Sequence, residues 1–231
     1  MSELKKVLRA CPLLGGLPDA GFAEAEDLAR WRSFHAGEGI YDKGSMQSSL
    51  CVIAEGTVRI SSVNAEGREA TLIIFGPGAW FGDTVFSPGT PRVYGATAHD
   101  AARIAELPGE GFRKLLARYP QAYPVALDLL SRRLWSAMSI IADDALRGIE
   151  ARVGRRLLFL AQIQGHGDAR DRPVTFRLTR EHIGNMMGMT RQGVHRVIKT
   201  LEREGLLKLD YGRITVISPK ALNVYLEALP D

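Results

Sequence analysis

Five polar side chains between residues 191 and 199 have the chemistry needed to read the edges of DNA bases. They are Arg191, Gln192, His195, Arg196 and Lys199. Arginine can make two hydrogen bonds to guanine O6 and N7, glutamine can do the same with adenine N6 and N7, and lysine can neutralise a phosphate. On a helix these side chains would lie opposite an apolar stripe formed by Val194, Val197, Ile198 and Leu201. The spacing therefore predicts a helix that can enter a major groove.

A second predicted helix precedes the first and would position it. Thr179 is a good N-cap for this helix, Glu181 lies in its first turn, and Gly188 ends it, after which Thr190 caps the polar helix. We place Thr179 and Thr190 in the predicted DNA-binding set with the five polar residues. Two short strands, 206–209 and 214–217, then flank a tight turn at 210–213, which is typical of a wing.

The alternative to a DNA-binding hairpin is an amphipathic helix hairpin whose charged face only contacts water. Gly188 at the turn, and the absence of acidic residues between Thr190 and Leu201, argue against it. The distribution of charge agrees with a DNA partner. Residues 146–231 carry 15 basic and 9 acidic side chains, whereas residues 1–145 carry 15 and 17. This asymmetry indicates a polyanion partner for the C-terminal part and another task for the N-terminal part.

The N-terminal part is predicted to consist of short strands separated by turns. The expected strands are 33–41, 50–60, 70–75, 79–86 and 94–107, and a helix follows at 109–118. Strands of this length with Gly, Asn and Pro at regular intervals are typical of a β-roll or barrel.

A long helix is predicted from Gln121 to about Asp144. Apolar residues spaced three and four apart form a seam along it: Leu127, Leu130, Leu134, Ala137 and Ile141. The seam could pack on the barrel of its own chain, but Trp135, Met138 and Ile140 provide a second apolar strip for that purpose, so we expect a two-chain coiled coil. A break at 145–148, a helix at 149–164 and a polar loop at 165–173 complete the pattern.

The composition narrows the class of protein. A chain of 231 residues with 45% hydrophobic and 24% charged residues is long enough for two small domains. No segment has the apolar length of a membrane span and the N-terminus lacks a signal-peptide core, so we expect a cytoplasmic protein without a membrane partner. Cys11 and Cys51 are too few for a disulfide framework or a four-cysteine metal site, and we expect ordinary thiols.

In this order the parts resemble the cyclic-AMP receptor protein family, the CRP/FNR regulators. The segments that carry the resemblance are F-H-A-G-E at Phe34, I-A-E-G-T-V-R-I at Ile53, F-G-D-T-V-F-S-P-G-T-P-R at Phe81, S-R-R-L at Ser131, and L-T-R-E-H-I-G at Leu178 running into T-R-Q-G-V-H-R. The resemblance implies a homodimer, an effector-binding β-roll and double-stranded DNA as partner. It also implies contact with RNA polymerase.

The resemblance assigns an effector pocket residue by residue. In the family, a Gly-Glu pair, an Arg that binds phosphate and a small polar residue after that Arg contact the ligand. The matching positions in this chain are Gly82, Asp83, Arg92 and Val93. The adenine-binding pair on the dimer helix falls on Ala137 and Met138. Asp83 is one methylene shorter than Glu, and Val93, Ala137 and Met138 depart from the family pattern. Arg92 favours an anionic effector, with a cyclic nucleotide as one candidate. The alternative is a remnant site in which Arg92 forms a surface ion pair.

Other classes of function have less support in the sequence. A redox or haem sensor of the same fold would need a cysteine cluster or histidines positioned as ligands. His35 and His99 are isolated in the sequence. A cupin-like metal enzyme would need clustered ligands, and the chain has no H-x-H pair. A scaffold that binds only protein would not need Gly188, Arg191 and Arg196. We therefore predict neither metal nor haem, and no enzyme.

The expected fold class is α+β. It comprises a sensory, jelly-roll-like β-roll over residues 1–120, a dimerisation helix and hinge over 121–147, and a winged helix-turn-helix over 148–231.

Overall fold

The computed structural model describes residues 1–67, 69–164 and 171–229. The chain divides into two compact units, Met1–Arg132 and Arg133–Asp231, which are described separately. No helix within these described ranges is long and apolar enough to cross a membrane.

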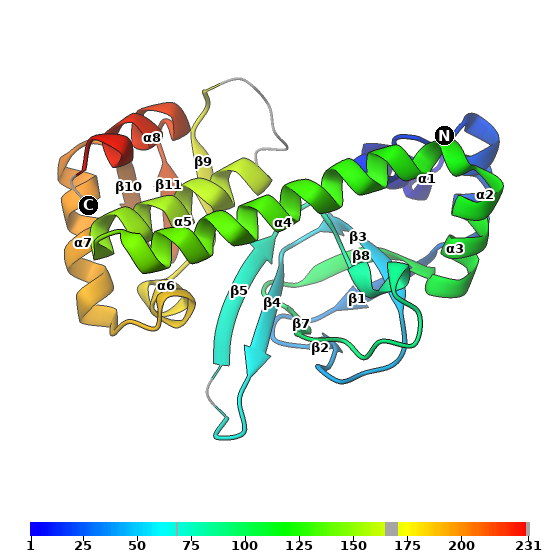
Figure 1. Cartoon of the computed structure of the whole chain (residues 1–231), viewed down its shortest axis with the longest axis horizontal. Helices are drawn as coiled ribbons and strands as arrows, with labels where there is room; N and C mark the ends of the chain where they lie inside the picture. The colour runs from blue at the N-terminus through cyan, green and yellow to red at the C-terminus, as the bar shows by residue number, and fades with distance from the viewer. Residues whose placement is uncertain (68, 165–170, 230–231) are drawn as a thin grey trace. The chain divides into compact units, whose positions relative to one another are not determined.

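Two four-stranded antiparallel sheets build the N-terminal unit (Figure 1). The first has the order β1 (Arg30–Phe34), β8 (Ala102–Pro108), β3 (Ser49–Glu55) and β6 (Trp80–Phe81). The second has the order β2 (Gly39–Tyr41), β7 (Gly95–Ala98), β4 (Val58–Val63) and β5 (Glu69–Phe75). β3 lies inside its sheet, between β8 and β6, and its first five residues are buried. This is the pattern expected of a strand with both faces covered.

Several of the predicted strands are divided in the structure. The expected strand 50–60 is interrupted by Gly56, which has φ +74°. The backbone at Ala101 lies so close that an added Cβ at Gly56 would be 2.1 Å from the Ala101 carbonyl oxygen. The expected strand 33–41 is divided at a turn containing Gly37, and 94–107 is divided between β7 and β8. The expected strand 79–86 is β6 followed by a 3-10 helix, η2 (Asp83–Phe86). Gly37, Gly56 and Gly82 have left-handed φ angles of +82°, +74° and +93°, which cannot continue a strand. The described segment 94–107 has no such glycine at its break.

Short helices close one end of this unit. α1 (Glu3–Ala10), η1 (Pro12–Leu14) and α2 (Asp19–Leu28) precede the sheets, and α3 (Gly109–Arg118) and η3 (Pro120–Ala122) follow them. Their apolar faces share one core with β3 and β8, which includes Leu8, Leu14, Phe22, Leu50, Leu107, Phe112 and Leu116. α3 has the predicted bounds, whereas α1 and α2 were not predicted. Ser2 caps α1 by accepting a hydrogen bond of 3.0 Å from the Lys5 amide.

The long helix α4 runs from Tyr123 to Leu146, close to its predicted extent. The boundary between the two units falls within it, between Arg132 and Arg133. Ala126 is its buried residue, so most of its surface is left to solvent in the single chain.

The C-terminal unit contains helices around a small sheet. α5 (Ile149–Gln164) has the predicted bounds, and α6 (Arg180–Met187), α7 (Arg191–Arg203) and α8 (Pro219–Ala228) follow. The sheet order is β10 (Leu207–Asp210), β11 (Arg213–Val216) and β9 (Val174–Phe176). Gly154 lets α8 approach α5, because an added Cβ there would be 2.4 Å from Leu226 Cδ2. β9 and α8 were not predicted, and residues 165–170 of the predicted polar loop lie outside the described residues.

These elements confirm the α+β class and the predicted order of a β-roll, a long helix and a winged helix-turn-helix.

Candidate nucleic-acid interface and effector site

The first helix of the hairpin begins with a reciprocal cap. The Thr179 hydroxyl accepts a hydrogen bond of 3.2 Å from the His182 amide, and His182 Nδ1 accepts one of 3.2 Å from the Thr179 amide. The sequence predicted Thr179 as the N-cap, but His182 as its partner was not foreseen, because Glu or Gln usually takes that place. The threonine side chain therefore already serves the fold of the hairpin.

Two glycines shape the turn between the helices. Gly188 has the left-handed conformation, with φ +60°, and ends α6 as predicted. Gly184 was not singled out in the sequence, yet an added Cβ there would be 2.7 Å from the Met189 carbonyl oxygen. The Thr190 hydroxyl then caps α7 by accepting a hydrogen bond of 3.2 Å from the Gly193 amide. The close approach at Gly184 and the cap at Thr190 fix the direction in which α7 leaves the turn.

α7 separates an apolar face from a polar face. Val194, Ile198 and Leu201 are buried, whereas Val197 is half-buried rather than fully buried as expected. The predicted base-reading residues Arg191, Gln192, Arg196 and Lys199 are exposed. His195 is half-buried, and its Nδ1 is a buried atom without a hydrogen-bond partner among the described residues. Successive residues are rotated by about 100°, so His195 lies at the edge of the polar face beside Val194.

The arginines and the lysine of this face differ in their contacts. Within the described ranges Arg191 and Arg196 make no ion pair, and no acidic residue precedes them in α7. Lys199 Nζ lies 2.5 Å from Glu202 Oε2, one turn further along the helix. The two arginines are therefore free to bond an external acceptor, whereas Lys199 would first have to give up its ion pair with Glu202.

The wing is formed as predicted, with a third strand beside it. β10 and β11 pair from Leu207 with Val216 to Asp210 with Arg213. Gly212 has φ +66° in the connecting turn, and Tyr211 at the tip is fully exposed. β9 pairs with the other edge of β11, which anchors the hairpin in the unit.

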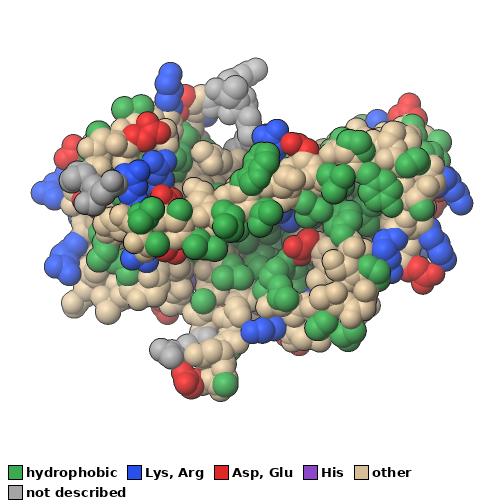
Figure 2. Space-filling model, in the orientation of Figure 1, with side chains coloured by type: hydrophobic (Ala, Val, Ile, Leu, Met, Phe, Trp, Pro, Cys, Tyr) green, Lys and Arg blue, Asp and Glu red, His purple; other side chains and the backbone are tan. Residues whose placement is uncertain are grey.

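α4 carries the exposed apolar seam. Leu127, Leu134 and Ile141 are 62%, 60% and 62% exposed, Ala137 is exposed, and Leu130 is half-buried. Trp135 and Met138 are exposed as well. Figure 2 shows hydrophobic side chains gathered along this helix. Large apolar side chains in water are unfavourable, by about 25 cal/mol per Å², so this surface favours a partner.

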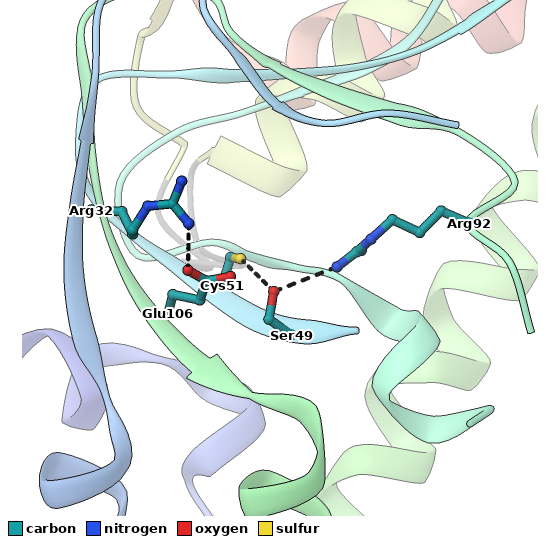
Figure 3. Close-up of polar contacts among 5 residues, drawn as sticks. All are labelled: Arg32, Ser49, Cys51, Arg92 and Glu106. Atoms are coloured by element: carbon teal, nitrogen blue, oxygen red, sulfur yellow. Dashed lines mark hydrogen bonds and ion pairs between the residues drawn. The ribbon is translucent and has the colours of Figure 1, made fainter. Parts of the chain in front are cut away.

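Arg92 is the buried charge of the N-terminal unit. Its side chain is 3% exposed, so the alternative of a surface ion pair is wrong. Arg92 Nε donates to the Gln47 carbonyl oxygen at 3.0 Å. Figure 3 shows the second contact, in which Nη2 donates to Ser49 Oγ at 3.4 Å. Nη1 is buried and has no hydrogen-bond partner among the described residues. A buried guanidinium with an unused donor is costly unless an acceptor is supplied.

Gly82 lies beside Arg92, and Asp83 follows it in the chain. Gly82 has φ +93°, and an added Cβ would be 2.1 Å from the Ser49 carbonyl oxygen and 3.7 Å from Arg92 Nη1. Asp83 Oδ1 accepts a hydrogen bond from the Tyr94 hydroxyl. The carboxylate that would bind a ligand hydroxyl therefore already has a partner, which the sequence did not indicate.

The remaining predicted effector residues are exposed in the described structure. Val93 is 64% exposed although Arg92 beside it is buried. Ala137 and Met138 are exposed on the part of α4 that belongs to the C-terminal unit.

The two cysteines are buried, as expected for ordinary thiols. Cys51 Sγ lies 3.7 Å from Ser49 Oγ, and burial, with the nearby Glu106 carboxylate, raises the pKa of the Cys51 thiol to about 12. Glu106 itself accepts a hydrogen bond of 2.9 Å from Arg32 (Figure 3). The thiolate, which is the reactive form, is thus strongly disfavoured at neutral pH. In the described part of the chain no three His, Cys, Asp or Glu side chains are grouped to hold a metal ion.

Comparison with known proteins identifies the two domains in which these residues lie. Residues 31–119 match the model of the cyclic nucleotide-binding domain, and residues 151–225 match the Crp-like helix-turn-helix domain. The chain is 28% identical to a CRP-like cAMP-activated global transcriptional regulator of Mycobacterium tuberculosis, over 93% of this chain and 96% of that protein. A solved CRP/FNR-family transcriptional regulator of Thermus thermophilus is 28% identical, with a TM-score of 0.61 over 86% of this chain and 99% of that one.

FixK2 of Bradyrhizobium japonicum shares the fold, with a TM-score of 0.72 and 19% identity over 88% of this chain and 99% of that one. The cyclic nucleotide-binding model matches before the Crp-like helix-turn-helix model along the chain. The regulators that combine these domains are a DNA-binding family and not an enzyme family. The chain therefore belongs to the CRP/FNR family of transcription regulators, with a cyclic nucleotide-binding domain and a Crp-like helix-turn-helix domain.

Proposed function

We propose that the protein is a homodimeric, effector-responsive regulator that binds inverted-repeat DNA through α7. The observation that carries this proposal is the exposed polar face of α7, on a helix whose start is fixed by Thr190 and whose other face is buried. Arg191, Gln192, Arg196 and Lys199 are the proposed contacts to bases and phosphates, with His195 at the edge. Thr179 and Thr190 act through the caps that position them.

The proposed dimer forms along the seam of Leu127, Leu130, Leu134, Ala137 and Ile141. Leu127, Leu134 and Ile141 are 60–62% exposed in the single chain, and a parallel partner helix would bury them against an identical surface. A two-fold dimer carries two copies of α7, which is why we expect an inverted repeat with half-sites about one helical turn (~34 Å) apart.

The proposed effector is a small anion held by Arg92. The buried guanidinium has an unbonded Nη1, and Gly82 adds no side chain near it: an added Cβ would lie 3.7 Å from Nη1 and 2.1 Å from the Ser49 carbonyl oxygen. A phosphate would satisfy this donor with a charge-assisted hydrogen bond. A cyclic nucleotide is one candidate, since the relative in Mycobacterium tuberculosis is named as cAMP-activated. Asp83, Val93, Ala137 and Met138 are proposed further contacts, by their positions in the family pattern.

We also propose three functional regions: a sensory domain over residues 1–120, a dimerisation helix and hinge over 121–147, and a DNA-binding domain over 148–231. Contact with RNA polymerase and a place in the cytoplasm are proposed from the family alone.

The DNA interface can be tested by fluorescence anisotropy with a labelled duplex that wild type selects from a pool of random sequences. A double variant, Arg191→Ala with Arg196→Ala, removes two contacts of about 1–3 kcal/mol each, so affinity for selected DNA should fall by at least tenfold. Arg118→Ala is the control, because it removes an exposed arginine of the N-terminal unit that pairs with Glu24. If the double variant binds as tightly as this control, α7 does not contact DNA.

A further inference from the structure

Tyr41 carries a second buried polar atom next to the unbonded nitrogen of Arg92. The Tyr41 hydroxyl oxygen is buried and, among the described residues, has no hydrogen-bond partner. A buried hydroxyl without a partner costs free energy, as a buried guanidinium nitrogen does, and such groups are uncommon in folded proteins. Two of them in contacting side chains indicate a shared acceptor that is supplied from outside the chain.

The two groups are stacked. Arg92 Cζ lies 3.5 Å from the centre of the Tyr41 ring, and the ring also packs against Phe81 with centroids 6.0 Å apart. Tyr41 is held at the end of β2 by its pairing with Ala96 on β7. Because the guanidinium and the phenol ring are in contact, we expect one oxyanion with two acceptor oxygens to reach both donors.

The backbone around the pair is also fixed. The Arg92 amide donates to the Ser45 carbonyl at 2.9 Å, and the Gly44 amide donates to the Arg92 carbonyl at 2.7 Å. Gly82 lacks the side chain that would otherwise lie 3.7 Å from Nη1. The donors therefore belong to a preorganised site, which lowers the ordering cost of binding.

The charge state of Tyr41 suits a donor. Burial raises the pKa of the phenol well above its ordinary value, Cys51 and Asp83 nearby raise it further, and the opposing effect of Arg92 is smaller than that of burial. The hydroxyl therefore keeps its proton at neutral pH and can donate a hydrogen bond to an anion.

We propose that the Tyr41 hydroxyl donates the second hydrogen bond to the oxyanion that Arg92 binds, and that Tyr41 is thereby a specificity-determining residue of the effector site. This inference rests on the proposed function of Arg92. The ligand class is a small molecule with a phosphate or carboxylate group whose two oxygens accept from Nη1 and from the phenol.

Tyr41→Phe tests this proposal in the full-length protein, because it keeps the ring under Arg92 and removes only the hydroxyl. The probes are inorganic phosphate, acetate, cyclic AMP and cyclic GMP, titrated calorimetrically. For the probe that wild type binds most tightly, we expect Tyr41→Phe to raise Kd by about 10- to 100-fold, since a hydrogen bond to a charged group is lost. Without any probe the melting temperature should stay the same or rise, because the hydroxyl has no partner to lose.

Tyr119→Phe is the matched control in the same unit. The Tyr119 hydroxyl donates to Glu24 at 2.7 Å, so this variant loses a hydrogen bond remote from Arg92 and should bind the probe as wild type does. If Tyr41→Phe binds like wild type while Arg92→Ala does not bind, the role of Tyr41 is refuted and the proposed function stands. A lower melting temperature of Tyr41→Phe without probe would show a structural role instead. Failure of every probe to bind wild type would contradict both proposals.

Discussion

Arg196 and Arg92 are the same residue type in opposite surroundings. Arg196 is exposed on α7 without an ion pair in the described structure, and water satisfies its five donors until a larger surface replaces it. Arg92 is 3% exposed, bonded to Gln47 and Ser49, and left with one unbonded nitrogen. The exposed arginine suits a macromolecule that docks from outside, whereas the buried one suits a small acceptor. The contrast separates the region that we propose reads DNA from the region that we propose binds the effector.

The largest effect should come from disrupting the proposed dimer seam on α4, the helix that connects the two regions. Leu134→Glu places a charge in the seam of α4, where Leu134 is 60% exposed in the single chain. Matched charges at a coiled-coil core repel, so we expect a monomer that no longer binds DNA. Light scattering should give twice the 25.3 kDa chain mass for wild type and the single mass for the variant.

Ser139→Glu is the control, because Ser139 is exposed on α4 outside the seam. It should remain dimeric. A wild type that stays monomeric at micromolar concentration would contradict the dimer.

The sensing region should respond most strongly to loss of Arg92. Arg92→Ala should abolish the part of DNA binding that depends on an anion, because a charge-assisted contact contributes more than an exposed ion pair. Anisotropy of labelled DNA with and without the anion measures this, and light scattering checks that the dimer persists. An undiminished response to the anion would place the effector site elsewhere.

Within the DNA-reading region, two neighbouring cations should behave differently. Arg196→Ala should cost about 1–3 kcal/mol and relax the preference at one base step. Lys199→Ala should weaken binding to all sequences and reduce the salt slope by about one ion. Because Lys199 pairs with Glu202, its loss should be the smaller of the two. Equal losses on specific and random DNA for both variants would show that α7 contacts only the phosphates.

The smallest effect is expected from Asp83→Glu. Asp83 accepts from the Tyr94 hydroxyl, and a longer side chain could reach a ligand hydroxyl that aspartate does not. If cyclic AMP is a weak ligand limited by the short carboxylate, this change should tighten its binding in a calorimetric titration. Unchanged heats for both Asp83→Glu and Arg92→Ala would favour a remnant site.

The sequence was most informative where local signals agree. α3 and α5 have the predicted bounds, and Thr179, Gly188 and Thr190 delimit the hairpin as their types indicate. α8 was missed although its start carries a signal, since Ser218 precedes Pro219 and accepts a hydrogen bond of 2.9 Å from the Ala221 amide.

The proposed effector site was less predictable because it depends on contacts between distant segments. Arg92 is bonded to Gln47 and Ser49, more than forty residues earlier in the chain, and stacks on Tyr41 of β2. No local pattern shows that an arginine in the segment T-P-R-V-Y will be buried. The Tyr94 contact to Asp83 likewise needs the turn after β6 to bring the two together. The resemblance to the family pointed to Arg92 and Asp83, but only the folded structure shows what surrounds them.

Selection of bound sites from random DNA tests the central claim, that a dimer reads DNA through the polar face of α7, most directly. Wild type and Gln192→Glu should be compared, because glutamine can bond adenine or guanine whereas glutamate accepts from cytosine N4. We predict an inverted repeat for both proteins, with a changed base at one position of each half-site in the variant. A selected motif that is not an inverted repeat, or one that is identical for the two proteins, would contradict the account.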